Sequence, residues 1–320
     1  MQAARRGHRF GNGDEMPRLG LGTWKSAPGD AYRAVKAAIA AGYRHIDCAA
    51  IYANEAEIGQ ALAEVFAAGE LRREQLWITS KLWNDRHAPA DVLPALRKTL
   101  ADLKLEYLDL YLVHWPIALK QGVLAPRSAA DLIPLRELPL AQTWAAMEPA
   151  VELGLARHLG VSNFSAAKLQ ALHAGARVKP EVNQVELHPY LQQPELLASC
   201  RALGVHVTAY SPLGSGDRPG GLKAADEPVL LGDPVIVDIA GRQGVSAAQV
   251  LIAWALQRGT SVIPKSIDPG RMRENLAAAA LTLSDEDIQR IAGLERRRRY
   301  LDGKFWIAGG VYSLAGLWDE

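Results

Sequence analysis

The sequence predicts an α/β protein built as a (β/α)₈ (TIM) barrel. Short β-branched and apolar runs alternate with longer stretches that carry apolar residues at helical spacing. Eight of the short runs can be counted, and polar side chains stand at the ends of most of them. Strands that alternate with helices form βαβ units and a parallel sheet, and eight such units close a barrel.

The runs that we predict as strands are residues 18–23, 45–48, 76–80, 108–113, 158–162, 182–186, 206–210 and 262–264. The helical stretches between them include residues 56–67, 91–104, 142–153 and 247–257. No internal repeat is visible beyond the βα unit, and no composition shift marks a boundary. Residues 1–320 are therefore predicted to form a single domain.

Three segments lie outside this alternation. Residues 8–17 carry an Asn-Gly turn between short runs, which predicts an N-terminal β-hairpin. Residues 116–139 and 213–232 exceed the usual loop length, so we expect them to cover the cofactor and the substrate. The C-terminal tail after Glu295 has aromatic residues but weak periodicity, and is expected to cover a pocket or one end of the barrel.

Composition excludes several classes of protein. The net charge of +1 gives no reason to expect a nucleic-acid or membrane partner. The two cysteines, Cys48 and Cys200, lie far apart and form neither a disulfide framework nor a metal-binding spacing. No apolar segment resembles a signal peptide or reaches the length of a membrane span. We predict a reduced, cytoplasmic protein.

Four residues at successive predicted strand ends point to acid–base chemistry. Asp47, Lys81 and His114 each end a run, and Tyr52 follows Asp47 by five residues. A free phenol has a pKa of about 10, and a neighbouring ammonium lowers it. We expect Lys81, held by Asp47, to make Tyr52 a proton donor. The alternative is a buried tyrosine, a structural ion pair and a core histidine; the occurrence of all four at strand ends favours a shared site.

Several motifs resemble the aldo-keto reductase family over residues 18–294, nearly the whole chain. They are residues 42–49 followed by Glu55, Ile58 and Gly59; His114-Trp115; residues 160–164, 183–186 and 210–214; and residues 263–266 with Arg271, Glu274 and Asn275. The resemblance implies an NADPH-dependent carbonyl reductase on a TIM barrel, most similar in pattern to the aldose reductase-like members.

The resemblance also implies roles for individual residues. Tyr52 would be the general acid, Lys81 and Asp47 its tuning pair, and His114 the donor that orients the carbonyl. The nicotinamide would be held at its carboxamide by Ser162, Asn163 and Gln184 and on its ring by Tyr210. Two simpler interpretations stay open: Asn163 begins the following helix, and Ser211 belongs to a turn.

The rest of the dinucleotide would be bound by later segments. Ser211 and Leu213 belong to the matching motif at residues 210–214 and would contact the cofactor. Residues 215–219 look like the loop that folds over the pyrophosphate, where Asp217 is expected to pair with Lys25. Lys265, Ser266 and Arg271 would bind the 2′-phosphate. Glu274 and Asn275 would contact the adenine. Asp268 stands where these reductases often carry Thr or Asn, so some use of NADH beside NADPH is also expected.

Aromatic residues are expected at the mouth of the pocket. Trp24, Trp83 and Trp115 each lie beside a predicted strand end and would give an apolar rim suited to aldehydes with a carbon tail. In the tail, Phe305, Trp306 and Tyr312 either line the pocket or only pack the barrel.

The predicted function is reduction of aldehydes, aldoses or ketones by NADPH, with no metal. The partner would be a small carbonyl compound, and the protein a monomer or weak dimer. One alternative is an alcohol dehydrogenase that works mainly in oxidation. Another is a non-catalytic regulatory subunit that binds the cofactor on the same barrel.

Overall fold

The sheet of the barrel has eight strands. The computed structural model describes residues 7–224 and 227–320. Within them the sheet runs in the order β12-β11-β10-β9-β6-β5-β4-β3, and each described register in it is parallel. The strands are β3 (Leu21–Gly22), β4 (His45–Asp47), β5 (Trp77–Leu82), β6 (Leu108–Val113), β9 (Ala156–Ser162), β10 (Val182–Glu186), β11 (His206–Tyr210) and β12 (Ser261–Val262).

The two strands at the ends of this order are also hydrogen bonded to each other. The N–H groups of Gly20 and Gly22 donate to the carbonyls of Val262 and Pro264, at 2.9 and 3.1 Å. These bonds close the order into a ring of eight, so the predicted (β/α)₈ fold is confirmed. Strands β6, β10 and β11 match the prediction residue for residue, whereas β3 is shorter than predicted.

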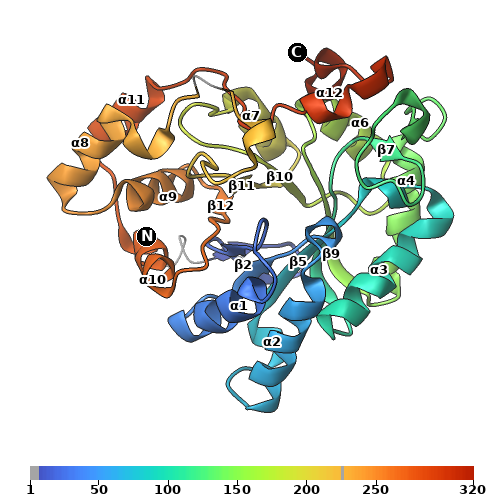
Figure 1. The fold of residues 1–320 in the computed structure, drawn as a ribbon, viewed down its shortest axis with the longest axis horizontal. Coiled ribbons are helices and arrows are strands. Elements are labelled where there is room, and N and C mark those ends of the chain that lie inside the picture. The colour runs from blue at the N-terminus through green and yellow to red at the C-terminus, as the bar shows by residue number, and fades with distance from the viewer. Residues whose placement is uncertain (1–6, 225–226) are drawn as a thin grey trace. The chain divides into compact units, whose positions relative to one another are not determined.

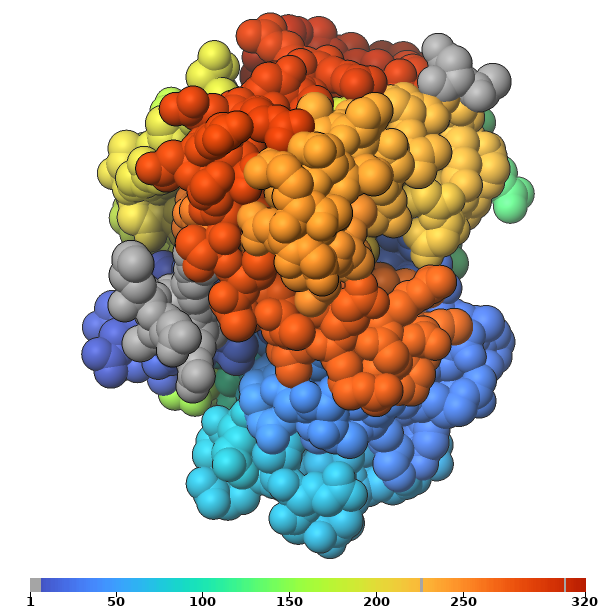
Figure 2. Space-filling model, turned by 90° about the vertical axis from the view of Figure 1, so that its left-hand side faces the viewer, coloured from blue at the N-terminus to red at the C-terminus, as the bar shows by residue number. Residues whose placement is uncertain are grey.

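The chain divides into two compact units, which we describe separately. The first unit contains residues 1–46, 185–194 and 207–301. Its helices are α1 (Asp30–Ala41), α8 (Pro234–Gln243), α9 (Ala247–Gln257), α10 (Pro269–Ala277) and α11 (Asp285–Ala292). Helix α1, in blue, lies against α10, in orange (Figure 2). The predicted N-terminal hairpin is confirmed, with β1 (Gly7–Arg9) antiparallel to β2 (Glu15–Pro17).

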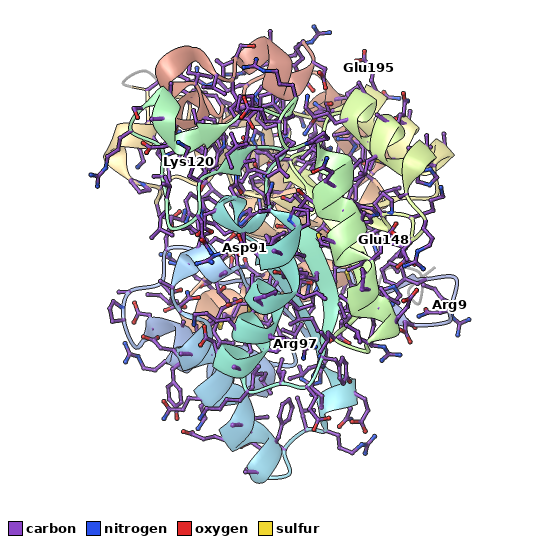
Figure 3. All side chains as sticks on the ribbon, turned by 90° about the vertical axis from the view of Figure 1, so that its right-hand side faces the viewer. Arg9, Asp91, Arg97, Lys120, Glu148 and Glu195 are labelled. Carbon is purple, nitrogen blue, oxygen red and sulfur yellow. The ribbon has the colours of Figure 1, made fainter. Side chains whose placement is uncertain are left out.

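The second unit contains residues 47–184, 195–206 and 302–320. Its helices are α2 (Glu55–Ala67), α3 (Pro89–Leu103), α4 (Leu140–Met147), α5 (Pro149–Glu152), α6 (Ala166–Gly175), α7 (Pro194–Ala202) and α12 (Leu314–Trp318). Helices α2 and α3 run side by side (Figure 1). Helix α4 packs on the other side of α3, as Figure 3 shows, where Asp91 and Arg97 mark α3 and Glu148 marks the end of α4.

Two details differ from the sequence-based expectation. The stretch predicted as one helix at residues 142–153 is two helices, α4 and α5, because Pro149 has no N–H to continue the hydrogen-bond ladder. The long segment 116–139 contains an antiparallel pair, β7 (Ala118–Leu119) and β8 (Leu132–Ile133). The segment 213–232 has two short 3₁₀ turns, and its residues 225–226 lie outside the described part. The prediction of one domain stays a prediction.

The closure between β3 and β12 depends on a glycine. A Cβ atom added to Gly22 would lie 2.8 Å from the carbonyl oxygen of Ile263. We expect Gly22→Ala to lower the free energy of unfolding by about 1–3 kcal/mol, since backbone cannot easily move aside. Urea unfolding midpoints measure the change. Gly241→Ala in α8 is the control because no atom lies within 4 Å of its added Cβ, and it should be neutral or stabilising. Equal midpoints for wild type and Gly22→Ala would contradict the close packing.

Candidate active site

The second unit brings the predicted catalytic side chains to the carboxyl ends of its strands. Asp47 is the last residue of β4, Lys81 lies one residue before the end of β5, and His114 follows β6 directly. Tyr52 ends a short 3₁₀ turn, η2 (Ala50–Tyr52), that follows β4. Because parallel strands end at one edge of the sheet, these side chains point toward a common region.

A buried ion pair forms the centre of this region. The Nζ atom of Lys81 lies 2.5 Å from Oδ1 of Asp47 and 2.8 Å from the carbonyl oxygen of Cys48. The exposed fractions of Lys81 and Asp47 are 0% and 2%. Burial, the largest single effect, acts to lower the pKa of Lys81. The effects of Asp47, Tyr52 and Cys48 together outweigh it, so that the pKa is raised and the lysine stays charged. The predicted pairing is confirmed.

Gln184 completes the hydrogen bonds of the Asp47 carboxylate. Its Nε2 donates to Oδ2 of Asp47 at 2.7 Å, so each carboxylate oxygen has a donor. The sequence suggested only cofactor contact for Gln184 and missed this bond. The Oε1 atom of the same amide accepts from no described residue, which leaves it available to a ligand N–H.

Tyr52 is placed between the ion pair and the histidine. Nζ of Lys81 lies 5.2 Å from the centroid of its ring, and the ring of His114 meets it edge-on at 5.9 Å. Burial raises the pKa of Tyr52 to about 12, although Lys81 acts to lower it. The expected effect of Lys81 therefore has the predicted sign but is smaller than the effect of burial. The expectation of a net lowered pKa is wrong for this structure.

His114 is neutral and can donate only one ring proton. Burial, followed by the charge of Lys81 and the nearby ring of His87, holds its pKa well below the ordinary value. The amide of Asn163 donates to the His114 carbonyl at 2.9 Å and to Oγ of Ser162 at 3.2 Å. Asn163 adopts a left-handed backbone (φ 62°), and the N-cap of α6 is Ser165. The interpretation of Asn163 as a helix-capping residue is therefore wrong.

Aromatic residues of the tail pack beside this site. The rings of Trp83 and Trp115 each lie 5.7 Å from the ring of Trp306, which is 1% exposed. Trp318, which the sequence analysis did not single out, lies 5.9 Å from Trp115. Trp306 thus packs in a buried cluster with Trp115, and Trp83 lies at its partly buried edge.

The tail is also held by hydrogen bonds. The hydroxyl of Tyr312 donates to the Ile133 carbonyl at 2.6 Å and accepts from the Ala118 N–H at 3.1 Å, which ties it to β7 and β8. Tyr312 is therefore a packing residue. Phe305 is partly buried and contacts Trp115 edge-on at 5.6 Å. Trp24 belongs to the first unit, so its place at the rim stays a prediction.

The first unit carries the residues expected to bind the phosphates. Nζ of Lys25 lies 2.5 Å from Oδ1 of Asp217 and 3.0 Å from Oγ of Ser215, and Lys265 approaches Asp217 at 3.7 Å. The pairing of Lys25 with Asp217 is confirmed. Ser211 begins a turn, closed by the Gly214 N–H at 3.0 Å, so the turn interpretation is also confirmed. Tyr210 precedes this turn and Leu213 lies within it, and both are half-buried.

Helix α10 presents its N-terminus next to Lys265 and Ser266. Arg271 lies exposed in its first turn, followed by half-buried Glu274 and buried Asn275. Asp268 is the N-cap: its Oδ1 accepts the Arg271 N–H at 2.7 Å. A helix N-terminus favours a bound anion, but here the Asp268 carboxylate already places a negative charge at that end.

No metal centre or single membrane-spanning helix is found in the described parts of the chain. Across residues 7–224 and 227–320, no three His, Cys, Asp or Glu side chains are grouped to hold a metal ion. Over the same ranges no single helix is long and apolar enough to span a membrane, although α8 and α9 pass that test together as a bent pair.

Comparison with known proteins identifies relatives over nearly the whole chain. The model of the aldo/keto reductase family matches residues 18–296. An aldo/keto reductase of Synechocystis sp. is 56% identical over 97% of this chain and 95% of its own length. Human aldo-keto reductase family 1 member A1 is 50% identical over 90% of this chain and 89% of its own length. The structure of the aldose reductase from Schistosoma japonicum superposes with a TM-score of 0.84 at 38% identity, covering 94% and 95% of the two chains.

A buried carboxyl beside the site should make stability depend on pH. Glu55 opens α2 and accepts hydrogen bonds from the hydroxyls of Ser80 and Thr99, on β5 and α3. Burial raises its pKa from 4.5 to about 7. The folded protein then binds this proton more tightly than the unfolded chain does. Its contribution to stability is complete below pH 4.5 and is lost as the pH rises through about 7.

We expect the free energy of unfolding of the wild type to fall by roughly 3 kcal/mol relative to Glu55→Gln between pH 4.5 and 8. Urea unfolding at a series of pH values measures the difference. Glu70→Gln, which removes an exposed carboxyl, should follow the wild type. Parallel curves for wild type and Glu55→Gln would show that Glu55 does not titrate in this range.

Proposed function

Because the chain belongs to the aldo/keto reductase family, we propose that it is an NADPH-dependent reductase of aldehydes, aldoses or ketones, in which Tyr52 is the general acid. Family membership makes it an oxidoreductase. The observation that supports the finer assignment most is the placement of Tyr52 between the buried Lys81 ammonium and the ring of His114.

The side chains of this site suit proton donation. A phenol with a pKa of about 12 stays protonated at neutral pH. The alkoxide formed in carbonyl reduction is a stronger base than a phenolate, so the proton moves from Tyr52 to the product oxygen. Neutral His114 donates its ring N–H to the same oxygen and stabilises the developing charge. The same group serves both directions of the reaction, so the equilibrium and the ratio of reduced to oxidised cofactor decide whether reduction or alcohol oxidation dominates.

The donor set fits a nicotinamide dinucleotide. When bound, the reduced nicotinamide supplies a hydride to the carbonyl carbon. We assign its carboxamide to Ser162, Asn163 and Gln184, and the available Oε1 of Gln184 suits a carboxamide N–H. Tyr210 would contact the ring. We assign the pyrophosphate to the loop with Asp217, and further cofactor contacts to Ser211 and Leu213. The 2′-phosphate is assigned to Lys265, Ser266 and Arg271, and adenine to Glu274 and Asn275.

We also propose the substrate class and the setting. Trp83 and Trp115, which pack against Trp306 of the tail, offer an aromatic surface that suits a small carbonyl compound with an apolar tail. Trp24 is proposed as a further rim residue. We propose that the protein works in the cytoplasm as a monomer or weak dimer, without metal, nucleic-acid or membrane partners.

The role of Tyr52 is tested by Tyr52→Phe. We expect the kcat for reduction of a small aldehyde by NADPH to fall at least about 10²-fold, because the acid is lost, while the Kd for NADPH stays the same. Stopped-flow absorbance at the nicotinamide band gives the rate, and quenching of protein fluorescence gives the Kd. Tyr111→Phe, at a fully buried tyrosine of β6, is the control and should keep wild-type activity.

Retention of most activity in Tyr52→Phe would refute its role as general acid. If the wild type binds NADPH but does not reduce aldehydes, the result would favour the interpretation of the protein as a non-catalytic regulatory subunit. Faster alcohol oxidation than aldehyde reduction under matched conditions would favour the dehydrogenase.

The choice of cofactor is tested by Asp268→Asn. Asparagine caps a helix as well as aspartate does, so the change keeps the cap and removes only the negative charge that we propose repels the 2′-phosphate. We expect the ratio of kcat/KM for NADPH over NADH to rise about tenfold, which corresponds to about 1.4 kcal/mol of relieved repulsion. Asp285→Asn makes the same charge change in the first turn of α11 and serves as the control. An unchanged ratio would contradict the role of Asp268.

A further inference from the structure

Two buried polar side chains just after β5 have no hydrogen-bond partner among the described residues. Asn84 is the first residue of the 3₁₀ turn η4 (Asn84–Arg86), and His87 is the residue after it. This turn follows β5 after one residue, Trp83. Neither amide atom of Asn84 and neither ring nitrogen of His87 bonds to any described residue. Their exposed fractions are 0% and 1%. They are therefore sealed from bulk solvent with four polar atoms unsatisfied.

The same segment adjoins His114. The backbone N–H of His114 donates to the carbonyl of Leu82, two residues before Asn84, at 3.2 Å. The ring of Trp83 meets the His114 ring edge-on at 5.0 Å, and the ring of His87 is close enough to influence the pKa of His114. Nδ1 of His114 is likewise buried without a partner among the described residues. The Nε2 atom is thus the nitrogen left to face a carbonyl.

Such a group of polar atoms is costly unless something satisfies it. Each unsatisfied buried donor or acceptor costs about 1–3 kcal/mol, and nearly all such atoms in proteins are bonded to protein or to water. Buried water occupies polar sites that offer it two to four partners, and Asn84, His87 and Nδ1 of His114 together supply five unsatisfied polar atoms. We propose that Asn84 and His87 hold buried water that donates a hydrogen bond to Nδ1 of His114 and thereby keeps the ring proton on Nε2.

This arrangement gives Nδ1 of His114 the donor that it lacks. A neutral imidazole has one donor and one acceptor, so a donor at Nδ1 fixes the Nε2–H tautomer. The second water proton goes to Oδ1 of Asn84 or to the bare nitrogen of His87. The amide N–H of Asn84 and the ring N–H of His87 donate to the water oxygen. With the proton on Nδ1 instead, Nε2 could not donate to a carbonyl.

Asn84 and His87 are positioning residues, and their role rests on the proposed function of His114 as carbonyl donor. The first test does not use activity. Nitrogen-15 NMR of histidine-labelled, full-length wild type distinguishes the two tautomers, and the His114 signals are those lost in His114→Gln. We expect Nδ1 to be unprotonated and Nε2 protonated at pH 7. The Nδ1–H tautomer in wild type would overturn the proposal.

The second test compares variants. Asn84→Leu and His87→Phe remove the polar atoms at similar volume, and His87→Gln keeps a donor and an acceptor. We expect the first two to lower kcat about tenfold without changing the Kd for NADPH, and to give mixed His114 tautomers. His87→Gln should retain most of the wild-type rate.

Thr143→Val is the matched control. It removes a buried hydrogen bond of 2.9 Å to the backbone carbonyl of His87 but keeps the side chains of Asn84, His87 and His114. It should leave the kcat and the His114 tautomer unchanged. An equal loss in Thr143→Val, or wild-type kcat and tautomer in both Asn84→Leu and His87→Phe, would overturn the proposal. The role of Tyr52 is decided separately by Tyr52→Phe. The proposed function and the proposed role of Asn84 and His87 can therefore fail independently of each other.

Discussion

The candidate site depends on one charge pair that is kept away from water. Lys81 and Asp47 lie 2.5 Å apart at 0% and 2% exposure. Removing each ion from water costs several kcal/mol, which their attraction offsets only if the remaining hydrogen-bonding capacity is used. Gln184 supplies the second carboxylate bond and the Cys48 carbonyl accepts from the ammonium, so the pair links side chains from β4, β5 and β10.

The same burial sets the protonation of the neighbouring groups. Low polarity disfavours every further charge, so Tyr52 keeps its proton and His114 stays neutral. A fixed ion pair beside two neutral donors is an arrangement that meets a developing oxyanion without reorganisation. The proposed buried water extends this arrangement one step further back, because a neutral histidine donates to the substrate only when its tautomer is fixed.

The sequence predicted the barrel and the grouping of the catalytic side chains well, for a physical reason. Strands buried on both faces read as continuous apolar runs, so β6, β10 and β11 were located to the residue, and polar residues at their ends had to share one edge. Features set by several segments at once were missed. The bond from Gln184 to Asp47 joins residues 137 positions apart, and the net pKa of Tyr52 depends on total burial. The unsatisfied atoms of Asn84 and His87 carry no local pattern at all.

The central claim is that burial, tempered by Lys81, keeps Tyr52 protonated and available as an acid. The ionisation of Tyr52 tests it most directly, followed by NMR of tyrosine labelled with carbon-13 at Cζ, with the Tyr52 signal identified by its loss in Tyr52→Phe. We expect the signal to stay at the position of a protonated phenol through pH 10, in keeping with a pKa of about 12. A transition to phenolate near neutral pH would contradict the account.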